Sequence, residues 1–396
     1  MLYSFYPHQT TQKIKDNYNE IQNQGKKAMQ NRLFSKFNRI RNAFLFGAVL
    51  PSLLIGSLPL MAQETEDGGP KPAKLFDNSD TLSVTMTAPW SDLMRDEKNQ
   101  NPYPAKIEFT DDLGNTMSLD TTAERRGITR QRVCDFPPIR LRFEKEVAQG
   151  TTFRGQKSIK IVTHCKKSDR YEQYYIMEML VYQMYNLITD YSFRVRPLNV
   201  NYVDSKTGKT DESRFAFLIE DDSDVAKRHG LKKLNVGKVR LSQLDPKVTS
   251  EMSLFQYMIG NIDWAGMSGP SPDECCHNVK PIGPEPLQRT DPVYPIPYDF
   301  DSSGLINAPY AAPPQGVSIT KVTQRLYRGY CKKNSGLEGA RTTIIAQEAN
   351  INSLVNNESL LTDKTKKKAI KYLAKFFKTV KNPKDFEKQI IKKCRS

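Results

Sequence analysis

Hydrophobic periodicity changes character near the middle of this chain of 396 residues, and the change limits the folds that the sequence can adopt. Between residues 82 and 162, apolar and polar residues alternate in short runs, as they do in β-strands with one buried face. Beyond residue 245, apolar residues recur every three or four positions, which is typical of amphipathic helices. The sequence therefore predicts an α+β protein with a β-rich first half and a helical second half.

One long helix is expected between the strands of the β-rich half. It covers residues 169–189, where Asp169 and Glu172 have the spacing of a capping box and apolar residues follow one face. Strands are expected over 82–87, 105–110, 117–120, 139–143 and 158–162, a second hairpin over 194–218, and further helices over 246–262, 319–332, 337–349 and 363–381. We expect the strands to form a small, mostly antiparallel sheet.

The N-terminal region has the composition of a targeting segment. Basic residues precede an almost uncharged run from Ala43 to Ala62, which matches the three parts of a secretory signal peptide, and Met29 alone could begin one of ordinary length. The run is also close to the roughly 20 residues that span a bilayer, so an N-terminal membrane anchor is the alternative. We expect an exported protein, periplasmic or secreted, with a leader over residues 1–62 and a linker over 63–78.

Positive charge is concentrated at the C-terminal end of the chain. Residues 362–396 hold 13 Lys+Arg and 3 Asp+Glu, whereas residues 63–361 hold 38 and 39. A nearly neutral body argues against a surface that tracks nucleic acid, so we expect no nucleic-acid partner. The predicted basic helix has an apolar face opposite its lysines. We expect this helix to dock on the protein's own core, with contact to an anionic envelope surface as the alternative.

Six cysteines in an exported chain predict disulfide bonds. They are Cys134, Cys165, Cys275, Cys276, Cys331 and Cys394. We expect the first two to pair, since both flank neighbouring predicted strands, and the two adjacent cysteines to reach the last two. The alternative is a zinc site at the adjacent cysteines and His277, with His164 and Cys165 as further ligands, although the usual spacing of zinc ligands is missing.

Acidic and amide side chains gather between residues 261 and 301. Asp263 follows a predicted helix, Asn278 follows a histidine, and Asp299 and Asp301 follow a predicted strand. Oxygen ligands of this kind suit Mg²⁺ or Mn²⁺, and phosphoryl transfer needs one further carboxylate to orient the attacking hydroxyl. The alternative is that these residues only cap a helix and a turn. We favour a metal and phosphate site.

These motifs, in this order, resemble the CotH-type spore-coat kinase family over about residues 120–310. The motifs are Arg126-Gly127, the tyrosine-rich helix with Glu178, Gly260-Asn261-Ile262-Asp263-Trp264, His277-Asn278 and Pro297-Tyr298-Asp299-Phe300-Asp301. The resemblance implies a kinase-like two-lobed fold. Its mostly antiparallel β lobe with one long helix would cover residues 79–220, its helical lobe 221–361, and a basic helix 362–396.

The resemblance also implies roles for the acidic and amide residues. Asp263 would orient the acceptor hydroxyl, Asn278 would help to hold Mg²⁺, and Asp299 or Asp301 would be the main metal ligand. The pattern departs from kinases in two respects. No G-x-G-x-x-G loop precedes these residues, and an insert with the adjacent cysteines separates Asp263 from Asn278.

Cations for the nucleotide phosphates are expected on the strands. Lys160, paired with Glu178 as in kinases, is the first candidate, and Arg126 is the second. Arg140 and Arg142 are rivals on a neighbouring predicted strand. For each of them a solvent-facing strand cation is the alternative interpretation.

The sequence thus predicts an exported atypical kinase-like phosphotransferase. It would use ATP with Mg²⁺ or Mn²⁺ to phosphorylate a hydroxyl group on a protein or another acceptor. Two rival functions remain at this point: a non-catalytic envelope binding or assembly protein with the same fold, and a metal-dependent hydrolase.

Overall fold

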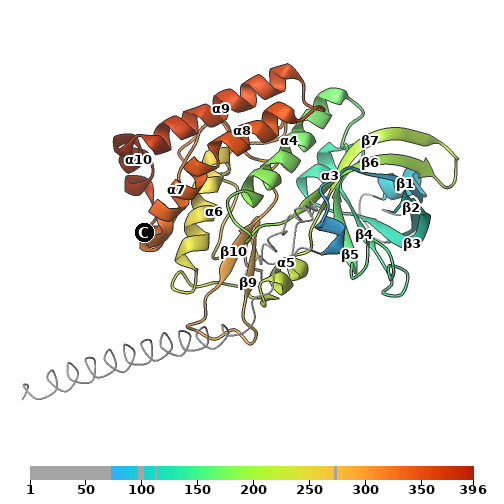
Figure 1. Cartoon of the computed structure of the whole chain (residues 1–396), viewed down its shortest axis with the longest axis horizontal. Helices are drawn as coiled ribbons and strands as arrows, with labels where there is room; N and C mark the ends of the chain where they lie inside the picture. The colour runs from blue at the N-terminus through green and yellow to red at the C-terminus, as the bar shows by residue number, and fades with distance from the viewer. Residues whose placement is uncertain (1–72, 97–101, 112–113, 272–273) are drawn as a thin grey trace, which may run out of the picture. The chain divides into compact units, whose positions relative to one another are not determined.

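Seven strands close into a β-barrel in the computed structural model, which describes residues 73–96, 102–111, 114–271 and 274–396 (Figure 1). Around the barrel, the strands follow the order β1 (Leu82–Ala88), β2 (Tyr103–Thr110), β3 (Thr116–Arg125), β4 (Ile139–Arg142), β5 (Ser158–Val162), β7 (Thr210–Ile219) and β6 (Val195–Asp204). The predicted leader and most of the predicted linker lie outside the described residues.

The barrel closes through a parallel pairing of β1 with β6. Its register runs from Leu82 opposite Leu198 to Ala88 opposite Asp204, while the other neighbouring strands pair in antiparallel fashion. The predicted kinase-like two-lobed fold with a mostly antiparallel sheet lobe is therefore wrong. The sheet is mixed and closed, and the described residues belong to one compact unit. Closure satisfies the backbone groups of both edge strands, which an open sheet would leave unpaired.

Strand β7 shows how alternation serves two cores at once. Ala216 and Leu218 point into the barrel, where they join the other inward-facing residues, while Phe215, Phe217 and Ile219 pack on the helical side. Successive side chains of a strand point to opposite faces, so a strand between two cores is apolar on both. The long helix α4 (Asp169–Asn186) covers the outer side of β6 and β7 and lies between the barrel and the helices that follow residue 245 (Figure 1).

The second half of the unit is built mainly from helices. The longer ones are α6 (Pro246–Ile259), α7 (Leu337–Ala346), α8 (Glu348–Asn357) and α9 (Asp363–Lys381). Shorter helical elements are η1 (Lys74–Phe76), α2 (Trp90–Arg95), α3 (Thr129–Val133), α5 (Asp222–Arg228), η2 (Cys331–Gly336), α10 (Pro383–Gln389) and η3 (Ile391–Lys393). A three-stranded sheet, β8 (Lys232–Lys233), β9 (Val279–Gly283) and β10 (Tyr294–Pro297), was not predicted.

The predicted helix over 319–332 is wrong. Its first part is irregular, and its arginines bind carbonyl groups of other segments instead. Arg325 donates to the carbonyls of Tyr257 and Met258 at the end of α6 and to that of Tyr372, and Arg328 donates to the carbonyl of Ile262. The carbonyl of Met258 is one that the end of α6 leaves free, and these tertiary bonds together outweigh local helical propensity.

Three disulfides connect the six cysteines. The predicted bond between Cys134 and Cys165 is confirmed, but the other pairing is wrong: Cys275 bonds to Cys276, and Cys331 bonds to Cys394. No cysteine of the described residues is free, which removes the thiolates that the zinc alternative requires. Three disulfides are typical of proteins that reside in oxidising compartments. Across the part of the chain that the structure describes, we find no helix that combines the length and the apolar composition needed to cross a bilayer.

Removal of the Phe217 ring tests the packing of the barrel against α4. Phe217 is fully buried and its ring lies 6.0 Å from that of Tyr182. We expect Phe217→Ala to lower the free energy of unfolding by about 3–5 kcal/mol, because it leaves a cavity between two cores. Lys209→Ala at the exposed hairpin tip should change it by less than about 0.5 kcal/mol. Denaturant titration of both variants measures the difference, and equal effects would contradict the assignment.

Candidate functional site

Three separate segments are joined by backbone hydrogen bonds next to the end of α6. The segment after α6 pairs with His277, since Ala265 and His277 exchange two backbone hydrogen bonds of 2.9 and 3.1 Å. The amide of Tyr298 donates to the carbonyl of Asn278, and the amide of Gly304 donates to the carbonyl of Gly260. The three segments that carry the predicted acidic and amide residues are therefore linked to one another by backbone hydrogen bonds around the end of the helix.

Gly260 explains why these segments pack closely. It ends α6 with φ at +67°, a left-handed conformation that glycine adopts without a steric penalty. A Cβ atom at this position would lie 2.0 Å from the hydroxyl of Tyr372 on α9. The residue after the helix must therefore be glycine for α6, α9 and the segment of Gly304 to approach this closely.

Asp263, His277 and Asn278 form a hydrogen-bonded group. The Nε2 atom of His277 lies 2.8 Å from a carboxylate oxygen of Asp263. The amide nitrogen of Asn278 donates to the backbone carbonyl of Asp263 at 2.7 Å and to its other carboxylate oxygen at 3.2 Å. The side chains of Asp263 and His277 are 32 % and 42 % exposed, so solvent reaches this group.

A buried guanidinium holds the second acidic group. Arg130 on α3 donates to Glu178 on α4 at 2.5 Å and to Asp301 at 2.9 Å, and it also donates to the hydroxyl of Tyr310. Asp299 lies 4.0 Å from the same guanidinium. Glu178 and Arg130 are almost fully buried, whereas the side chain of Asp299 is 42 % exposed. The site thus has a buried part, the ion pairs of Arg130 with Glu178 and Asp301, and a carboxylate that solvent can reach, that of Asp299.

The electrostatics of the site follow from this arrangement. Burial and the negative charge of Asp301 together raise the pKa of Asp299 to about 6, while Arg130 and Arg126 oppose the shift. Burial also raises the pKa of Glu178, to about 8, against the opposing charge of Arg130. Burial acts to lower the pKa of Arg130, but its carboxylate partners and Tyr310 raise it well above the usual value. A cation placed near these carboxylates would stabilise their charged forms and lower their pKa values.

Asn278 and Asp299 both have left-handed backbones, with φ of 51° and 59°. This conformation costs most side chains about 1–2 kcal/mol, and asparagine and aspartate enter it more readily than others. Each residue donates a hydrogen bond that fixes it: the amide of Asp299 to the hydroxyl of Tyr182 at 2.8 Å, and the side-chain nitrogen of Asn278 to the carbonyl of Asp263 at 2.7 Å. Two unusual backbones in one cluster mark a functional candidate.

Cations gather beside the acidic group, around the ring of Tyr298. The ammonium groups of Lys160 on β5 and Lys280 on β9 lie 5.9 and 5.0 Å from the ring centroid. Arg126 is close enough for its charge to act on both Lys160 and Asp299. Burial lowers the pKa of Lys160 to about 8, and the charge of Arg126 contributes in the same direction, so an anion placed here would be stabilised.

The predicted residues fall into three sets in the structure. Asp263 bonds to Asn278 and its charge acts on Asp299, which shares Arg130 with Asp301. Arg126 is close enough to act on Asp299, and Lys160 lies over the ring of the neighbouring Tyr298. Glu178 was expected to pair with Lys160. It pairs with Arg130 instead, and through Arg130 it contacts the acidic group. Arg142 lies apart: it pairs with Glu124 on the outer surface of the barrel, as does Arg140.

The sequence did not indicate Arg130 as a member of the site. It lies in a five-residue helix without a recognisable motif, and only its position four residues before Cys134 links it to a fixed point of the fold. His277 was weighed for zinc and not for the hydrogen bond to Asp263 that it makes. Both omissions have the same origin, because the members of each pair lie in different segments and a pair between segments leaves no local pattern.

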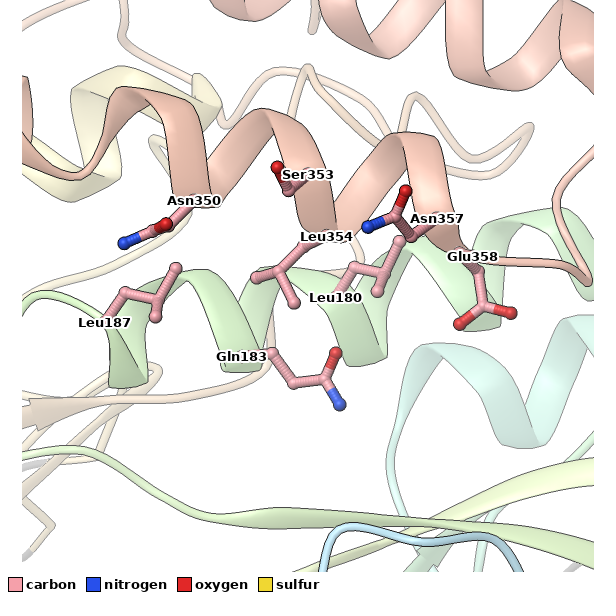
Figure 2. A pocket seen from close by; sticks show the side chains of 8 residues that line it. All are labelled: Leu180, Gln183, Leu187, Asn350, Ser353, Leu354, Asn357 and Glu358. Atoms are coloured by element: carbon pink, nitrogen blue, oxygen red, sulfur yellow. The ribbon is translucent and has the colours of Figure 1, made fainter.

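A surface groove lies elsewhere, between α4 and α8 (Figure 2). Its lining residues are Leu180, Gln183, Leu187, Asn350, Ser353, Leu354, Asn357 and Glu358. None of the predicted site residues is among them. The candidate site is thus defined by converging polar side chains rather than by this groove.

The acidic residues do not form a ready-made metal cage. Within the described ranges, no three histidine, cysteine, aspartate or glutamate side chains are grouped so that they could hold a metal ion. Mg²⁺ commonly takes only one or two carboxylates from the protein and its remaining ligands from substrate phosphates and water. The donor set fits that mode: Asp299 supplies a carboxylate, and Asn278 has its amide oxygen left because its nitrogen donates to Asp263.

No family model, curated protein or solved structure matched this chain. The interpretation of the site consequently depends on its own geometry.

Replacement of Arg130 tests the buried part of the site. We expect Arg130→Met to lower the free energy of unfolding by about 3–5 kcal/mol, because it leaves Glu178 and Asp301 without their cation. Arg132→Met on the exposed side of α3 is the matched control and should change it by less than about 0.5 kcal/mol. The double variant Arg130→Met with Glu178→Gln should recover part of the loss, which chemical denaturation measures. Simple additivity of the two changes would contradict a direct ion pair.

The hydrogen bond between Asp263 and His277 predicts a shifted titration. The bond raises the pKa of His277 above its usual value of about 6.5, burial opposes the shift, and the charges of Asp263 and Asp299 support it. We expect Asp263→Asn to lower the His277 pKa in an NMR titration and to leave that of His229 unchanged. Because the folded pKa is raised, the stabilisation is complete below about pH 6.5 and disappears as pH rises through the folded pKa. The variant should therefore lose more Tm at pH 6 than at pH 9.

Proposed function

We propose that this protein is an exported phosphotransferase that uses ATP with Mg²⁺ or Mn²⁺ and phosphorylates a hydroxyl group on a protein or another acceptor. The observation that carries the proposal is the meeting of Asp263, Asn278 and Asp299, which come from separate segments, beside the cations at Tyr298. Adjacent acidic and basic groups match a substrate that is itself a polyanion with a bound cation. The two-lobed kinase fold forms no part of this argument, since function resides in sites.

Each group has a defined role in the proposed transfer. Arg126 and Lys160 bind the phosphates, and Asp299 and Asn278 supply oxygen ligands to the metal that arrives with the nucleotide. Asp263 orients the acceptor hydroxyl and takes its proton, while His277 holds the carboxylate in place. The acceptor oxygen forms the new bond to the γ-phosphorus, the bond from that phosphorus to the bridging oxygen breaks, and ADP leaves with the electron pair.

Asp301 and Glu178 act indirectly in this scheme. Both are bound by Arg130, and the side chain of Asp301 is only 12 % exposed. Their ion pairs fix the segment that carries Asp299. The oxidising compartment that the three disulfides indicate is proposed to be the periplasm or the extracellular space.

A non-catalytic binding or assembly protein is the second candidate function. It is favoured by the ion pair between Arg130 and Asp301, because an internal cation already neutralises one of the two carboxylates of the D-F-D motif. A protein of this kind would retain the polar cluster for its contribution to structure. It would show no response to nucleotide.

Thermal stability in the presence of nucleotide separates these functions. We expect ATP with Mg²⁺ or Mn²⁺ at about one hundred times Kd to raise the Tm by on the order of 5 °C, because a ligand that binds only the folded state stabilises it by about 2.7 kcal/mol. Asp299→Asn should abolish the gain and keep the fold. Asp120→Asn, at an exposed carboxylate of β3, is the matched control and should retain it.

The same experiment contains its contrary outcomes. An unchanged Tm with nucleotide and metal together would contradict the proposal and favour the binding protein. A gain with metal alone, together with release of phosphate from a simple ester, would instead indicate a hydrolase. Incorporation of labelled γ-phosphate into acceptor, lost in Asp299→Asn, tests the transfer itself.

A further inference from the structure

Helix α9 carries a continuous row of lysines on its outer side. The row consists of Lys364, Lys367, Lys368, Lys371, Lys375 and Lys378, all exposed, and we call it the lysine stripe. Spacings of three and four residues place all six on one face of an α-helix, and fourteen residues at 1.5 Å each give the stripe a length of about 21 Å. In Figure 1, α9 lies at the margin of the helical part.

The opposite face of α9 is already occupied by the protein itself. Ala369, Leu373, Phe376, Phe377 and Val380 are buried in the core that α4, α6 and α7 share. The expectation that this helix docks on its own core is therefore confirmed. Docking fixes the orientation of the helix, so the stripe faces outward as a rigid feature and the apolar face is not available to insert into a membrane.

Among the described residues, no ion pair within 4.0 Å involves a lysine of the stripe, and Asp363 at its first turn is the one acidic residue of α9. The ion pairs of this region are made by other lysines, Lys381 with Glu348 and Lys392 with Glu387. Like charges three and four residues apart on a helix destabilise it by a few tenths of a kcal/mol for each pair. An anionic surface placed against the stripe would remove this repulsion.

Large apolar side chains are exposed at both ends of this basic region. Leu360, just before α9, is 55 % exposed, and Ile391, just after α10, is 37 % exposed. In the ranges that the structure describes, Ile128 is the only other large hydrophobic residue that is exposed. A soluble polyanion gains nothing from such side chains, whereas the interface of a bilayer accepts them next to basic residues.

Nucleic acid fits the stripe less well. The aromatic side chains of α9 are turned toward the core: Phe376 and Phe377 are buried, and Tyr372 packs against Arg325 with 3.8 Å between the guanidinium and the ring. Proteins that bind single strands without sequence preference stack bases on exposed aromatic rings. The stripe offers charge alone.

We propose that the lysine stripe binds the surface of an anionic lipid bilayer and holds the protein flat against it. The inference concerns a surface separate from the phosphotransferase site and does not depend on that activity. The contact is electrostatic, with Leu360 and Ile391 as shallow apolar contacts, and it should weaken as salt screens the charges.

Vesicle sedimentation tests the proposal with the full chain. The readout is the ratio of binding to vesicles of phosphatidylcholine and phosphatidylglycerol in equal parts over binding to pure phosphatidylcholine. The N-terminal segment, which is basic before its apolar run, is the same in wild type and variants, so its contribution cancels when their ratios are compared. We expect a ratio well above one that falls with salt. A stripe variant with glutamine at positions 367, 371, 375 and 378 should lose at least about tenfold in this ratio, because each lysine near an anionic surface contributes roughly fivefold.

The matched control removes the same charge from the barrel. It carries glutamine in place of four exposed lysines, Lys106, Lys145, Lys157 and Lys209, and should keep the wild-type ratio. Both variants must show wild-type circular dichroism and Tm. An equal loss in the two variants would reduce the effect to net charge and overturn the proposal. Binding of wild-type protein to soluble polyphosphate without preference for anionic vesicles would overturn it as well.

Discussion

The buried guanidinium of Arg130 is the contact through which the barrel side, α4 and the D-F-D segment are held together. It binds Glu178 on α4 and Asp301 after β10, and the disulfide from Cys134 fixes the short helix that carries it. Desolvation of an arginine and two carboxylates costs several kcal/mol per ion, and their attraction repays this only with good geometry. A buried triad of this kind is therefore weak evidence for stability. It is stronger evidence for a fixed position, because a buried guanidinium that must reach Glu178 and Asp301 together permits few alternative arrangements.

Predictability from sequence differed between the elements and their arrangement. The strands β1 to β7 and the basic helix α9 could be placed because each has a local periodicity. The long helix α4 is buried on most sides between Tyr175 and Tyr185, and its length without glycine or proline is what made it predictable. The parallel pairing of β1 with β6 could not be predicted, since alternation shows which face is buried but not which strand lies beside it. Local patterns do not show how the strands are arranged, so the arrangement was taken from the resemblance to a kinase family, and it was wrong. The irregular segment over 319–332 failed for a related reason: its arginines bind distant carbonyl groups, which no window of sequence contains.

The candidate site was more predictable than the fold around it. Asp263, Asn278 and Asp299 lie within a short stretch of sequence, so the backbone hydrogen bonds that join their segments close small loops at low entropic cost. The cations come from farther away, and there the prediction was partial. Arg126 does lie near Asp299, and Lys160 lies over the ring of Tyr298. The partner of Glu178, however, is Arg130, and Arg142 lies on the outside of the barrel.

The acidic site and the lysine stripe each bring like charges close together, but they differ in burial and in compensation. At the acidic site, burial and mutual repulsion raise the pKa of Asp299, while Arg130 compensates part of the charge and fixes the geometry. A ligand there must match positions as well as charge, and burial shields its interactions from salt. The lysine stripe is solvated and uncompensated, so it selects by charge density and loses its attraction as ionic strength rises. A flat anionic surface bound along α9 would thus restrict how the protein diffuses without demanding any rearrangement of the site. For an enzyme whose acceptor is itself attached to an envelope, confinement to that surface would raise the local concentration of acceptor with no change in the chemistry.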